Sequence, residues 1–427
     1  MRSMSAPKRS FLLRAWRFGW WQVLRFLAYI WCAVEYLFFL LLHLRRIRQA
    51  EYVYPLWFWS FGHQATDPHM LALRFHGKKL LVLLSDYGNF SPYIVDAFRP
   101  HLDIVDFRQS RWLRHFLPAL TSVRVTRMKQ RILSLVLYLF RCRTQVVHTF
   151  YERFGLPMEG YYHTEYLRLL SSSEPNVVHP RREHVQQFRD MLRREHHILD
   201  DRWFVSFYFR RKHRNPAEVR DTQPATYKEA ISLVTQNGGW VFCGGDCDPR
   251  EEFPGMEHVF GYRDFPCDRS LCDLFFLTQC AFLVCGQSGP LAMAIAFATP
   301  TLVANAALYY ITGCRDNQRI CYKKLVERRT GRALTAREIF RLPTLCLNSN
   351  AQFDRADLVH VDNTPEELCA AVEEMLAFII FRKDITHSAE YGVLYRRFHE
   401  MLPPESFVAQ TSCMPTLGCL RALRLEE

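Results

Sequence analysis

The sequence of 427 residues lacks the patterns that mark several classes of protein. It contains no internal repeat and no low-complexity tract, which excludes repeat architectures and long segments of biased composition. No RNP-type motif and no zinc-finger pattern is present, so we do not expect a nucleic-acid partner. No small-residue cleavage site follows the apolar run near the N-terminus, so that run is not a cleavable signal peptide.

Metal-binding patterns are also missing. The 14 cysteines include no C-x2-C pair of the kind that zinc sites use. Asp246 and Asp248 come nearest to an Asp-x-Asp pair after a strand, but Asp248-Pro249 is typical of a turn, so no metal cofactor is implied. Cysteines such as Cys285 lie inside apolar runs, where they behave as small hydrophobes. We expect the cysteines to be reduced and unpaired, which favours a reducing compartment.

Length and charge limit the number of domains and the class of partner. A chain of this length predicts two domains rather than one core. Lysine and arginine outnumber aspartate and glutamate by 55 to 43, a net charge of +12. Such an excess favours anionic partners, which are nucleic acid, anionic lipid or a phosphorylated substrate.

Residues 1–50 form a basic and aromatic segment. The run from Phe26 to Leu44 is apolar apart from Glu35 and one histidine, and as a helix it would rise about 28 Å, close to the thickness of a bilayer core. Glu35 near its middle, Arg25 before it and cations at both ends argue against a simple span. We expect a membrane-associated helix that either spans once or lies in the interface. The alternative is a buried core helix.

Beyond this segment, apolar runs alternate with helical patterns. Residues 79–85 and 203–209 are continuous apolar runs, which is typical of buried parallel strands. The alternation predicts an α/β fold with parallel sheets. Residues 171–180 are the best linker candidate.

Three helix starts can be predicted from local sequence. Asp67-Pro68 opens one helix, and Thr226 with Glu229 matches a capping box. Thr364-Pro365-Glu366-Glu367 matches an N-cap followed by proline and glutamate in the first turn.

The stretch from Asp268 to Asn305 predicts helix, strand, turn, helix and strand in succession. Its central turn is Gly286-Gln287-Ser288-Gly289-Pro290. Two glycines let a ligand approach the backbone, Ser288 can cap the helix, and the helix start favours an anion. A plain N-cap turn explains the pattern equally well.

Other candidate residues follow predicted strands. Arg210 leaves the strand at 203–209, and its guanidinium matches a phosphate in a bidentate way, whereas Lys212 and Arg214 fit a solvated basic loop. Ligands in open α/β sheets bind beyond the carboxyl ends of the strands. Gly244-Gly245-Asp246 can place a carboxylate on a ribose or base edge, or can be a tight turn in which Asp246 caps the next segment.

In the first half of the chain, Gly62-His63 ends a candidate strand, and histidine is a natural general base near neutral pH. A hydrogen-bonded structural histidine is the alternative. Asp86 and Asn89 are further candidates at the end of the strand at 79–85.

Taken in order, these motifs resemble a family of mainly bacterial glycosyltransferases with a GT-B-like C-terminal block, related in outline to heptosyltransferases and O-fucosyltransferases. The resemblance covers roughly residues 58–380, and its most specific part runs from 203 to 305. The matching pieces are Phe61-Gly62-His63, the strand ending in Arg210, Arg220-Asp221 with Tyr227, residues 238–241 with Gly245-Asp246, Cys272-Asp273-Leu274-Phe275, residues 280–290, Pro300 with Asn305, Lys323-Lys324, residues 334–340 and residues 363–376. Related enzymes often carry a histidine where this chain has Tyr208, and an acidic or polar residue where it has Arg211.

The resemblance implies two Rossmann-like domains in a GT-B-like arrangement, after the N-terminal helix. The predicted divisions are a membrane-associated segment 1–50, an acceptor domain 51–180, a nucleotide-sugar-binding domain 200–362, C-terminal helices 363–400 that pack back toward the N-domain, and a tail 401–427.

It also implies a glycosyltransferase that moves a sugar from a nucleotide-activated donor to a glycan or lipid-linked acceptor. No cofactor is implied beyond the donor substrate. The predicted catalytic residues are His63 and Arg210. The predicted nucleotide-sugar-binding residues are Arg210, Gly245, Asp246, Gln287, Ser288, Gly289 and Asn305. The implied location is the cytoplasmic face of a membrane. The competing hypothesis, motivated by Tyr208 and by the lack of an acidic catalytic pair, is an inactive GT-B-like protein that binds glycans or serves as a membrane-tethered scaffold.

Overall fold

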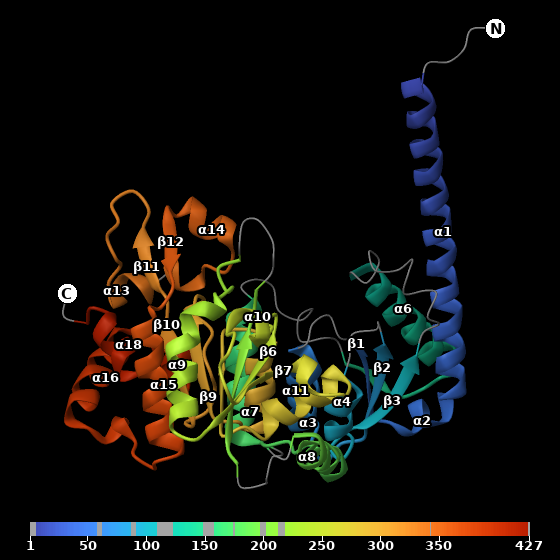
Figure 1. Ribbon diagram of the computed structural model, residues 1–427. Coiled ribbons are helices and arrows are strands. Elements are labelled where there is room, and N and C mark those ends of the chain that lie inside the picture. Colours follow the sequence, from blue (N-terminus) through green and yellow to red (C-terminus); the bar gives the residue numbers. More distant parts are fainter. Residues whose placement is uncertain are drawn as a thin grey trace. The chain divides into compact units, whose positions relative to one another are not determined.

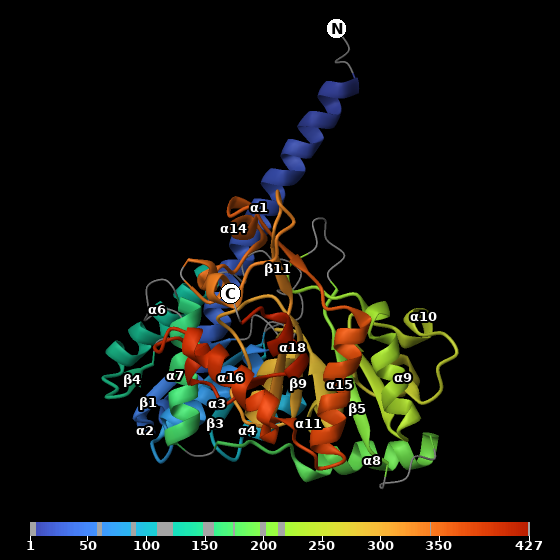
Figure 2. The same ribbon diagram turned by 90° about the vertical axis from the view of Figure 1, so that its left-hand side faces the viewer.

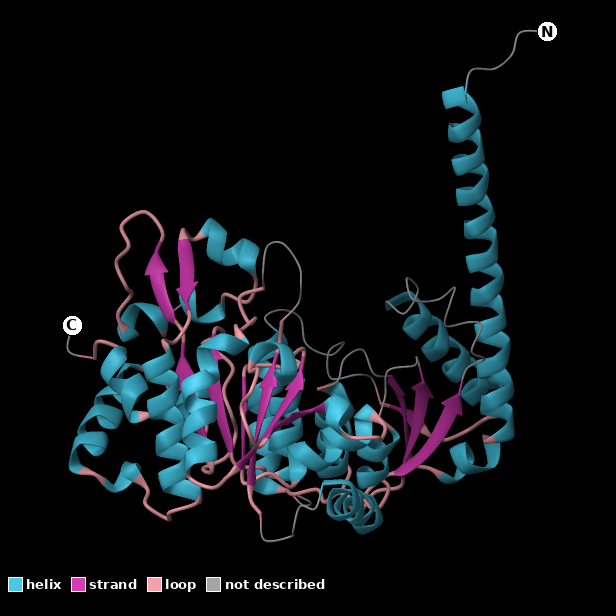
Figure 3. Cartoon of the chain, viewed as in Figure 1, coloured by secondary structure: helices cyan, strands magenta, loops and turns pink. Residues whose placement is uncertain are grey.

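The computed structural model divides into two compact units (Figures 1 and 3). Unit 1 comprises residues 1–60, 77–90 and 99–153, and unit 2 comprises residues 61–76, 91–98 and 154–427. The structure describes residues 6–57, 62–86, 91–108, 123–147, 158–173, 176–196, 202–211, 218–341 and 343–425. Asn89, Lys212 and Arg214 therefore lie outside the described residues.

Unit 1 contains a parallel four-stranded sheet with the order β3-β2-β1-β4. Its strands are β1 (Tyr52–Trp57), β2 (Leu80–Asp86), β3 (Asp103–Arg108) and β4 (Gln145–Val146). Strand β4 pairs with β1 only at Tyr52 and Val53, so Pro55 lies beyond the paired part on that side, where its missing N–H costs no ladder bond. The predicted strand at 79–85 is confirmed as β2, which ends at Asp86.

The described helices of unit 1 are α1 (Ala6–Leu42), α2 (Leu44–Gln49) and α6 (Val123–Leu139). The C-terminal part of α1 packs into the core of the unit, where Tyr36 and Leu40 meet Leu133 of α6 and Leu81 and Leu83 of β2. Residues Trp20–Leu42 are long and apolar enough to cross a membrane, by length and composition alone.

Unit 2 contains a parallel seven-stranded sheet with the order β13-β10-β9-β8-β5-β6-β7. Its strands are β5 (Phe204–Phe209), β6 (Trp240–Gly245), β7 (Val259–Gly261), β8 (Phe282–Cys285), β9 (Thr301–Ala306), β10 (Gln318–Tyr322) and β13 (Met414–Pro415). A separate antiparallel pair consists of β11 (Lys324–Glu327) and β12 (Leu358–Val361). The prediction of parallel sheets is confirmed for both units.

The described helices of unit 2 are α3 (His63–Arg74), α4 (Pro92–Phe98), α7 (Met158–Ser172), α8 (Arg182–His196), α9 (Lys228–Gln236), α10 (Pro249–Glu252), α11 (Arg269–Thr278), α12 (Gly289–Phe297), α13 (Ala336–Ile339), α14 (Asn350–Arg355), α15 (Pro365–Ile379), α16 (Ala389–Met401), α17 (Phe407–Gln410) and α18 (Leu417–Ala422). The succession predicted from Asp268 to Asn305 is confirmed as α11, β8, α12 and β9.

Helices cover both faces of the seven-stranded sheet. Val205, Phe207 and Phe209 of β5 belong to one core cluster with residues of α9 and α15, which lie side by side in Figure 2. On the other face, the ring of Phe276 in α11 stacks on that of Phe242 in β6 with centroids 3.8 Å apart. This double cover explains why the strands read as continuous apolar runs.

The predicted helix starts have different outcomes. The capping box at Thr364 is confirmed, with its hydroxyl accepting from the N–H of Glu367. The capping box at Thr226 is wrong, because Thr226 lies inside a 3-10 turn (Pro224–Tyr227) and donates to the Gln223 carbonyl. The start at Asp67-Pro68 is also wrong, since α3 begins at His63 and contains Pro68 in its interior.

Candidate functional site

The order of strands in unit 2 creates a switch point between β5 and β8. From β5 the chain proceeds to β6 and β7 on one side, whereas β8 lies on the other side of β5 and leads to β9 and β10. In open α/β sheets, ligands bind outside the carboxyl ends of the two strands at such a point. Tyr208 of β5 pairs with Cys285 of β8, so Arg210 and the turn from Gly286 to Gly289 leave the sheet at neighbouring strand ends.

The turn after β8 ends in an uncapped helix start. Ser288 occupies the N-cap position of α12, but its hydroxyl lies 3.4 Å from the Gly286 carbonyl and makes no capping bond. The predicted side-chain cap is therefore wrong. Pro290 follows at the start of the helix, where its missing N–H costs nothing. A helix start without a capping side chain keeps its positive dipole end and its N–H groups accessible to an anion.

Two arginines meet on one carboxylate beside this turn. Arg210 and Arg220 both donate to Glu218, and Asp221 lies 3.4 Å from Nε of Arg210. Burial lowers the pKa of Arg210 and the charge of Arg220 lowers it further, while Glu218 and Asp221 act in the opposite direction. Nη1 of Arg220 also lies 3.5 Å from the carbonyl oxygen of Gln287, so it reaches the turn itself.

Arg220 was not among the predicted site residues, although the Arg220-Asp221 pair formed part of the family resemblance. Its signal in the sequence is the spacing of ten residues after Arg210, but residues 212–217 between them gave no indication that the chain returns to the same place. A hydrogen bond of 3.0 Å from the Thr222 N–H to the Arg210 carbonyl shows that the chain comes back to Arg210.

The side chain of Gln287 holds a neighbouring loop. Its Oε1 accepts from the N–H groups of Ala307 and Leu308 at 2.9 and 2.8 Å, and its Nε2 donates to the carbonyls of Leu308 and Ile311, both at 2.6 Å. The amide is thus fully used by the loop after β9. Gln287 can meet a ligand only through its backbone, and its side chain fixes the shape of the turn.

Gly245 and Asp246 join the ends of β6 and β5. Gly245 has a φ of +78°, and a Cβ there would lie 2.1 Å from the Phe209 carbonyl oxygen, so glycine is required. The exposed Asp246 accepts from the N–H of Arg211 at 3.1 Å and donates its own N–H to the Phe209 carbonyl at 2.8 Å. The turn is tight, but the next segment, α10, is capped by Asp248, which accepts from the Arg250 N–H, whereas the Asp246 carboxylate lies beside Arg211.

Asn305 is buried at the end of β9. It has a φ of +51°, and its backbone and side chain bond reciprocally with Asn363, at 3.0 and 2.7 Å. Its Nδ2 also donates to the Tyr227 hydroxyl at 3.0 Å. Asn305 therefore ties β9 to the start of α15 and to the turn before α9.

Lys323, from the matched Lys323-Lys324 pair, reaches the same region. Its buried ammonium lies 2.7 Å from a carboxylate oxygen of Asp362 and 3.0 Å from the carbonyl oxygen of Asp221. It thereby fixes the backbone of the residue that faces Arg210.

Tyr208 belongs to a buried network. Its hydroxyl and that of Tyr262 both donate to Oδ1 of Asp273, at 2.7 and 2.5 Å. Burial raises the pKa of Asp273, while the two hydroxyl bonds oppose that rise. The Arg269 guanidinium lies 4.2 Å from the centre of the Tyr262 ring and donates to the Gly245 carbonyl. Through Arg269 and Tyr262, this network holds the backbone of Gly245 at the end of β6.

His63 begins α3, which packs against α12 within unit 2. Its Nδ1 lies 3.3 Å from Oδ1 of the buried Asp67. Burial alone would lower the pKa of His63, but the Asp67 carboxylate outweighs it and raises the pKa above the usual histidine value. A Cβ on Gly62, the residue before, would lie 3.1 Å from Cα of Gly289. The starts of α3 and α12 therefore touch.

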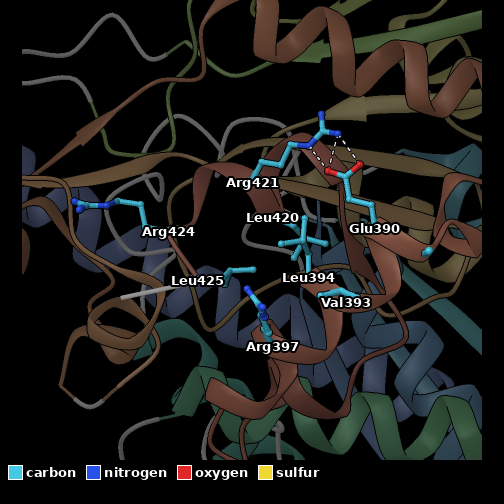
Figure 4. Close-up of a pocket in the computed structure, with 9 residues that line it drawn as sticks. Glu390, Val393, Leu394, Arg397, Leu420, Arg421, Arg424 and Leu425 are labelled. Atoms are coloured by element: carbon cyan, nitrogen blue, oxygen red, sulfur yellow. Dashed lines mark hydrogen bonds and ion pairs between the residues drawn. The ribbon is translucent and has the colours of Figure 1, made fainter.

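Among the described residues, no group of three or more histidine, cysteine or acidic side chains could hold a metal ion. A cavity of about 670 Å³ lies elsewhere in unit 2, between α16 and α18 (Figure 4). Glu390 pairs with Arg421 at its rim, with two hydrogen bonds of 2.8 Å. None of the predicted site residues lines this cavity.

No protein-family model matches the sequence, and no curated protein matches it. The fold is similar to the crystal structure of the glycosyl transferase family 9 from Veillonella parvula DSM 2008, with a TM-score of 0.50 and 10% identity. The match covers 77% of this chain and 98% of that one. It shows an α/β fold with two parallel sheets that is GT-B-like, as the sequence predicted.

Two further solved structures align with lower scores. E. coli heptosyltransferase WaaC with ADP-2-deoxy-2-fluoro heptose gives a TM-score of 0.37 at 11% identity, over 63% of this chain and 92% of that one. UDP-GlcNAc 2-epimerase from Neisseria meningitidis bound to UDP-GlcNAc gives 0.31 at 10% identity, over 59% and 82%.

Proposed function

We propose that this chain is a glycosyltransferase that moves a sugar from a nucleotide-activated donor to a glycan or lipid-linked acceptor. One observation carries the proposal: two arginines on one carboxylate and an uncapped helix start stand at the two strand ends of the switch point. That combination suits a diphosphate, since guanidinium groups bind phosphate in a bidentate way and helix starts bind anions through N–H groups.

The diphosphate of the donor binds between Arg220 and the start of α12. Arg220 is the more accessible of the two arginines, and it already reaches the Gln287 carbonyl. Arg210 is largely buried, and its charge adds to the positive potential at the diphosphate position without direct contact. When the bond to the sugar breaks, negative charge grows on the diphosphate, and these fixed groups stabilise it as it leaves.

The acceptor hydroxyl is activated by His63. A histidine can take up a proton near neutral pH, and Asp67 holds its ring and stabilises the charged form. The contact between Gly62 and Gly289 keeps this group next to the helix start that binds the diphosphate.

The other predicted residues have different parts. Asp246, exposed at the end of β6, contacts the nucleoside, and Gly245 allows the tight turn that presents it. Gln287 and Asn305 act by positioning, because their side chains hold the loop after β9 and the start of α15. Ser288 and Gly289 offer their backbone to the phosphates. The protein works at the cytoplasmic face of a membrane, where a lipid-linked acceptor is available.

Titration with GDP-, UDP-, ADP- and CMP-sugars tests the donor assignment. Arg220→Ala should weaken binding of the correct donor by about tenfold or more, the loss expected for a charge-assisted phosphate contact. Arg250→Ala is the matched control, because Arg250 is an exposed arginine that pairs with Asp264. Arg210→Lys keeps the buried charge and should have a smaller effect. If every donor binds Arg220→Ala as well as the parent, the diphosphate assignment fails.

The same screen separates the enzyme from the inactive alternative. Slow hydrolysis of any donor sugar supports the transferase. A complete screen without binding or turnover favours an inactive glycan-binding or scaffold protein, which the network around Tyr208 would also allow.

A further inference from the structure

Between Trp20 and Leu42, the described residues of helix α1 present apolar side chains on all sides of the helix. One stripe, formed by Ala28, Cys32, Tyr36 and Leu40, is buried against the rest of unit 1. The other described faces between residues 20 and 42 are exposed, and Gln22 is the one polar residue among those exposed side chains. The exposed apolar residues are Trp20, Trp21, Val23, Phe26, Leu27, Ile30, Trp31, Val34, Leu37, Phe38, Leu41 and Leu42.

Helix α6 continues this surface. It lies alongside the second half of α1, with Met128 in one cluster with Cys32, and Leu133 in the next with Tyr36. On its outer side, three apolar residues at helical spacing are exposed: Leu135 by 53%, Tyr138 by 80% and Leu139 by 62%. The stripe is identified by the exposure of these side chains in the folded unit.

The exposed surfaces of α1 and α6 lie at the same position along the two helices. Tyr36 and Leu40 of α1 share a core cluster with Leu133, Val136 and Leu137 of α6. The exposed residues of α1 near residues 37–42 therefore lie at the same position along the helix pair as the exposed stripe of α6. The pair is held together by more than apolar contact, since the buried ammonium of Lys129 lies 5.2 Å from the centre of the Tyr36 ring.

Cations border this surface. Arg45 in α2 is exposed directly after α1, and Arg131, Arg141 and Arg143 are exposed on either side of the α6 stripe. Long basic side chains at the edge of an apolar surface reach the phosphates of lipid headgroups. The tryptophans Trp20, Trp21 and Trp31 suit the same layer.

A lipid bilayer fits this surface better than a protein partner. A partner helix or a second copy would cover one face of α1 and leave its opposite face polar, as in coiled coils. Here the exposed residues described between 20 and 42 are apolar on every remaining face apart from Gln22, which calls for an apolar solvent rather than one docked face. Glu35, the one carboxylate in the run, accepts from Nε1 of Trp31 at 2.7 Å and so enters that environment with a hydrogen bond made.

The packing of α1 on unit 1 also indicates that the helix inserts into one face of the bilayer and does not cross it. Tyr36, Phe39 and Leu40 belong to the core with Val53, Leu81 and Val105 of the sheet, so α1 is fixed to the folded unit from Tyr36 onward. The sequence of the helix ahead of Tyr36 carries Arg14, Arg17 and Arg25, so no uninterrupted apolar run of the roughly 20 residues that a span needs precedes the part fixed to the folded unit. The sequence of α6 is basic near its start, Arg141 and Arg143 follow its end, and the chain then returns to the sheet at β4.

We propose that unit 1 binds an anionic lipid bilayer from one side through a composite surface, the exposed apolar residues of α1 together with Leu135, Tyr138 and Leu139 of α6. Embedding this surface places the first sheet at the membrane and gives α6 a role equal to that of the N-terminal helix. This inference does not depend on the donor site in unit 2.

Flotation of the full chain with phosphatidylcholine vesicles containing about one-fifth phosphatidylglycerol tests the α6 contribution. The triple variant Leu135→Gln, Tyr138→Gln, Leu139→Gln should weaken partitioning by about tenfold or more, because three apolar side chains lose their burial in lipid. The matched control is Val359→Gln with Val361→Gln, which replaces exposed apolar residues of β12 and should leave partitioning unchanged. Partitioning of the triple variant equal to that of the parent would overturn the proposal.

A second measurement holds even if the triple variant folds poorly. A benzoylphenylalanine placed at Tyr138, where the side chain is 80% exposed, should crosslink to lipid when vesicles are present. Crosslinks to a second copy of the chain, or none at all, would contradict the lipid assignment. An N-terminal tag should stay open to protease on the same side as unit 2; protection of the tag inside the vesicle would show a span and overturn one-sided binding.

Discussion

Arg210 and Arg220 share one carboxylate, that of Glu218, at the switch point of the larger sheet. Two guanidinium groups this close repel each other, and the pKa of Arg210 is lowered by burial and by Arg220. Glu218 therefore accepts from the two guanidinium groups that the proposed site offers to a phosphate. If the proposed donor site is right, the carboxylate and a diphosphate compete for the same donors.

This competition predicts a gain of affinity when the carboxylate is neutralised. Glu218→Gln should bind nucleoside diphosphates roughly three- to tenfold more tightly, since the ligand no longer displaces an ion pair. The variant should also lose roughly 1 to 3 kcal/mol of unfolding free energy, because the two arginines are left less well paired. Calorimetric titration and urea unfolding measure the two effects.

Glu252→Gln is the control for Glu218→Gln. It removes the partner of Arg211 at 2.6 Å but leaves the shared carboxylate of Glu218 in place. Equal affinities of the parent and both variants for nucleoside diphosphates would contradict the competition.

The contact between Gly62 and Gly289 predicts a cost for one added methyl group. Ala at Gly62 would bring its Cβ to 3.1 Å from Cα of Gly289 and 3.4 Å from Cβ of Ala292, so α3 and α12 must separate slightly. Such overpacking should destabilise the protein by about 1 to 3 kcal/mol. Gly392→Ala is the matched control, because nothing lies within 4 Å of a Cβ there in α16, and it should stabilise by roughly 0.5 to 1 kcal/mol. Urea unfolding of both variants checks the pair, and a loss of stability at Gly392 equal to that at Gly62 would refute the argument.

The strand ends of the site could be predicted from the sequence, because each follows an apolar run that only a buried parallel strand explains. The sequence around Thr364 was also sufficient to predict the start of α15. Pro365 follows directly, and the Thr364 hydroxyl accepts from the Glu367 N–H as the pattern predicted. The same Thr-x-x-Glu pattern at Thr226 failed because Pro224 starts a 3-10 turn two residues earlier and gives that hydroxyl a nearer carbonyl.

The interior of the site could not be predicted in this way. Gln287 looked like a ligand in a glycine-rich turn, but its amide is used by a loop 20 residues further on, and nothing local encodes that contact. Arg220 was overlooked because its place beside Arg210 depends on how the chain returns after residues 212–217. Spacing gives the position of a residue along an element, whereas hydrogen-bond partners across elements depend on the tertiary fold.

Glu374 in α15 predicts a dependence of stability on pH. Burial raises its pKa from 4.5 to about 7, although the N–H of Leu417, at 2.9 Å, and Arg319 oppose that rise. A raised carboxyl pKa means that the folded state holds the proton more tightly than the unfolded state. The stabilisation is complete below about pH 4.5 and is lost as the pH rises to about 7, with a magnitude on the order of 3 kcal/mol.

Glu374→Gln should remove this contribution. The free energy of unfolding of the variant relative to the parent should therefore increase between pH 5 and pH 8. Glu373→Gln on the exposed side of the same helix is the control and should show no such trend. A difference between Glu374→Gln and the parent that stays constant with pH would mean that Glu374 titrates normally.

The pair of His63 and Asp67 predicts the pH dependence of the proposed transfer. Asp67 raises the pKa of His63 above its usual value, so a base at this position becomes active only as the pH exceeds that raised value. Asp67→Asn removes the carboxylate while keeping the shape, and the pKa of His63 should then fall, because burial alone lowers it. The acid limb of the rate profile should move to lower pH in the variant, and an NMR titration of the ring should move with it. The pair also affects the stability of the fold, which it increases below about pH 6.5 and no longer increases once the pH has risen through the raised pKa of His63. Asp67→Asn should reverse this trend, because burial alone lowers the pKa of His63 and stability is then lost as the pH falls. A ring titration that shifts while the rate profile stays fixed would leave His63 as a structural histidine and remove it from the catalytic assignment.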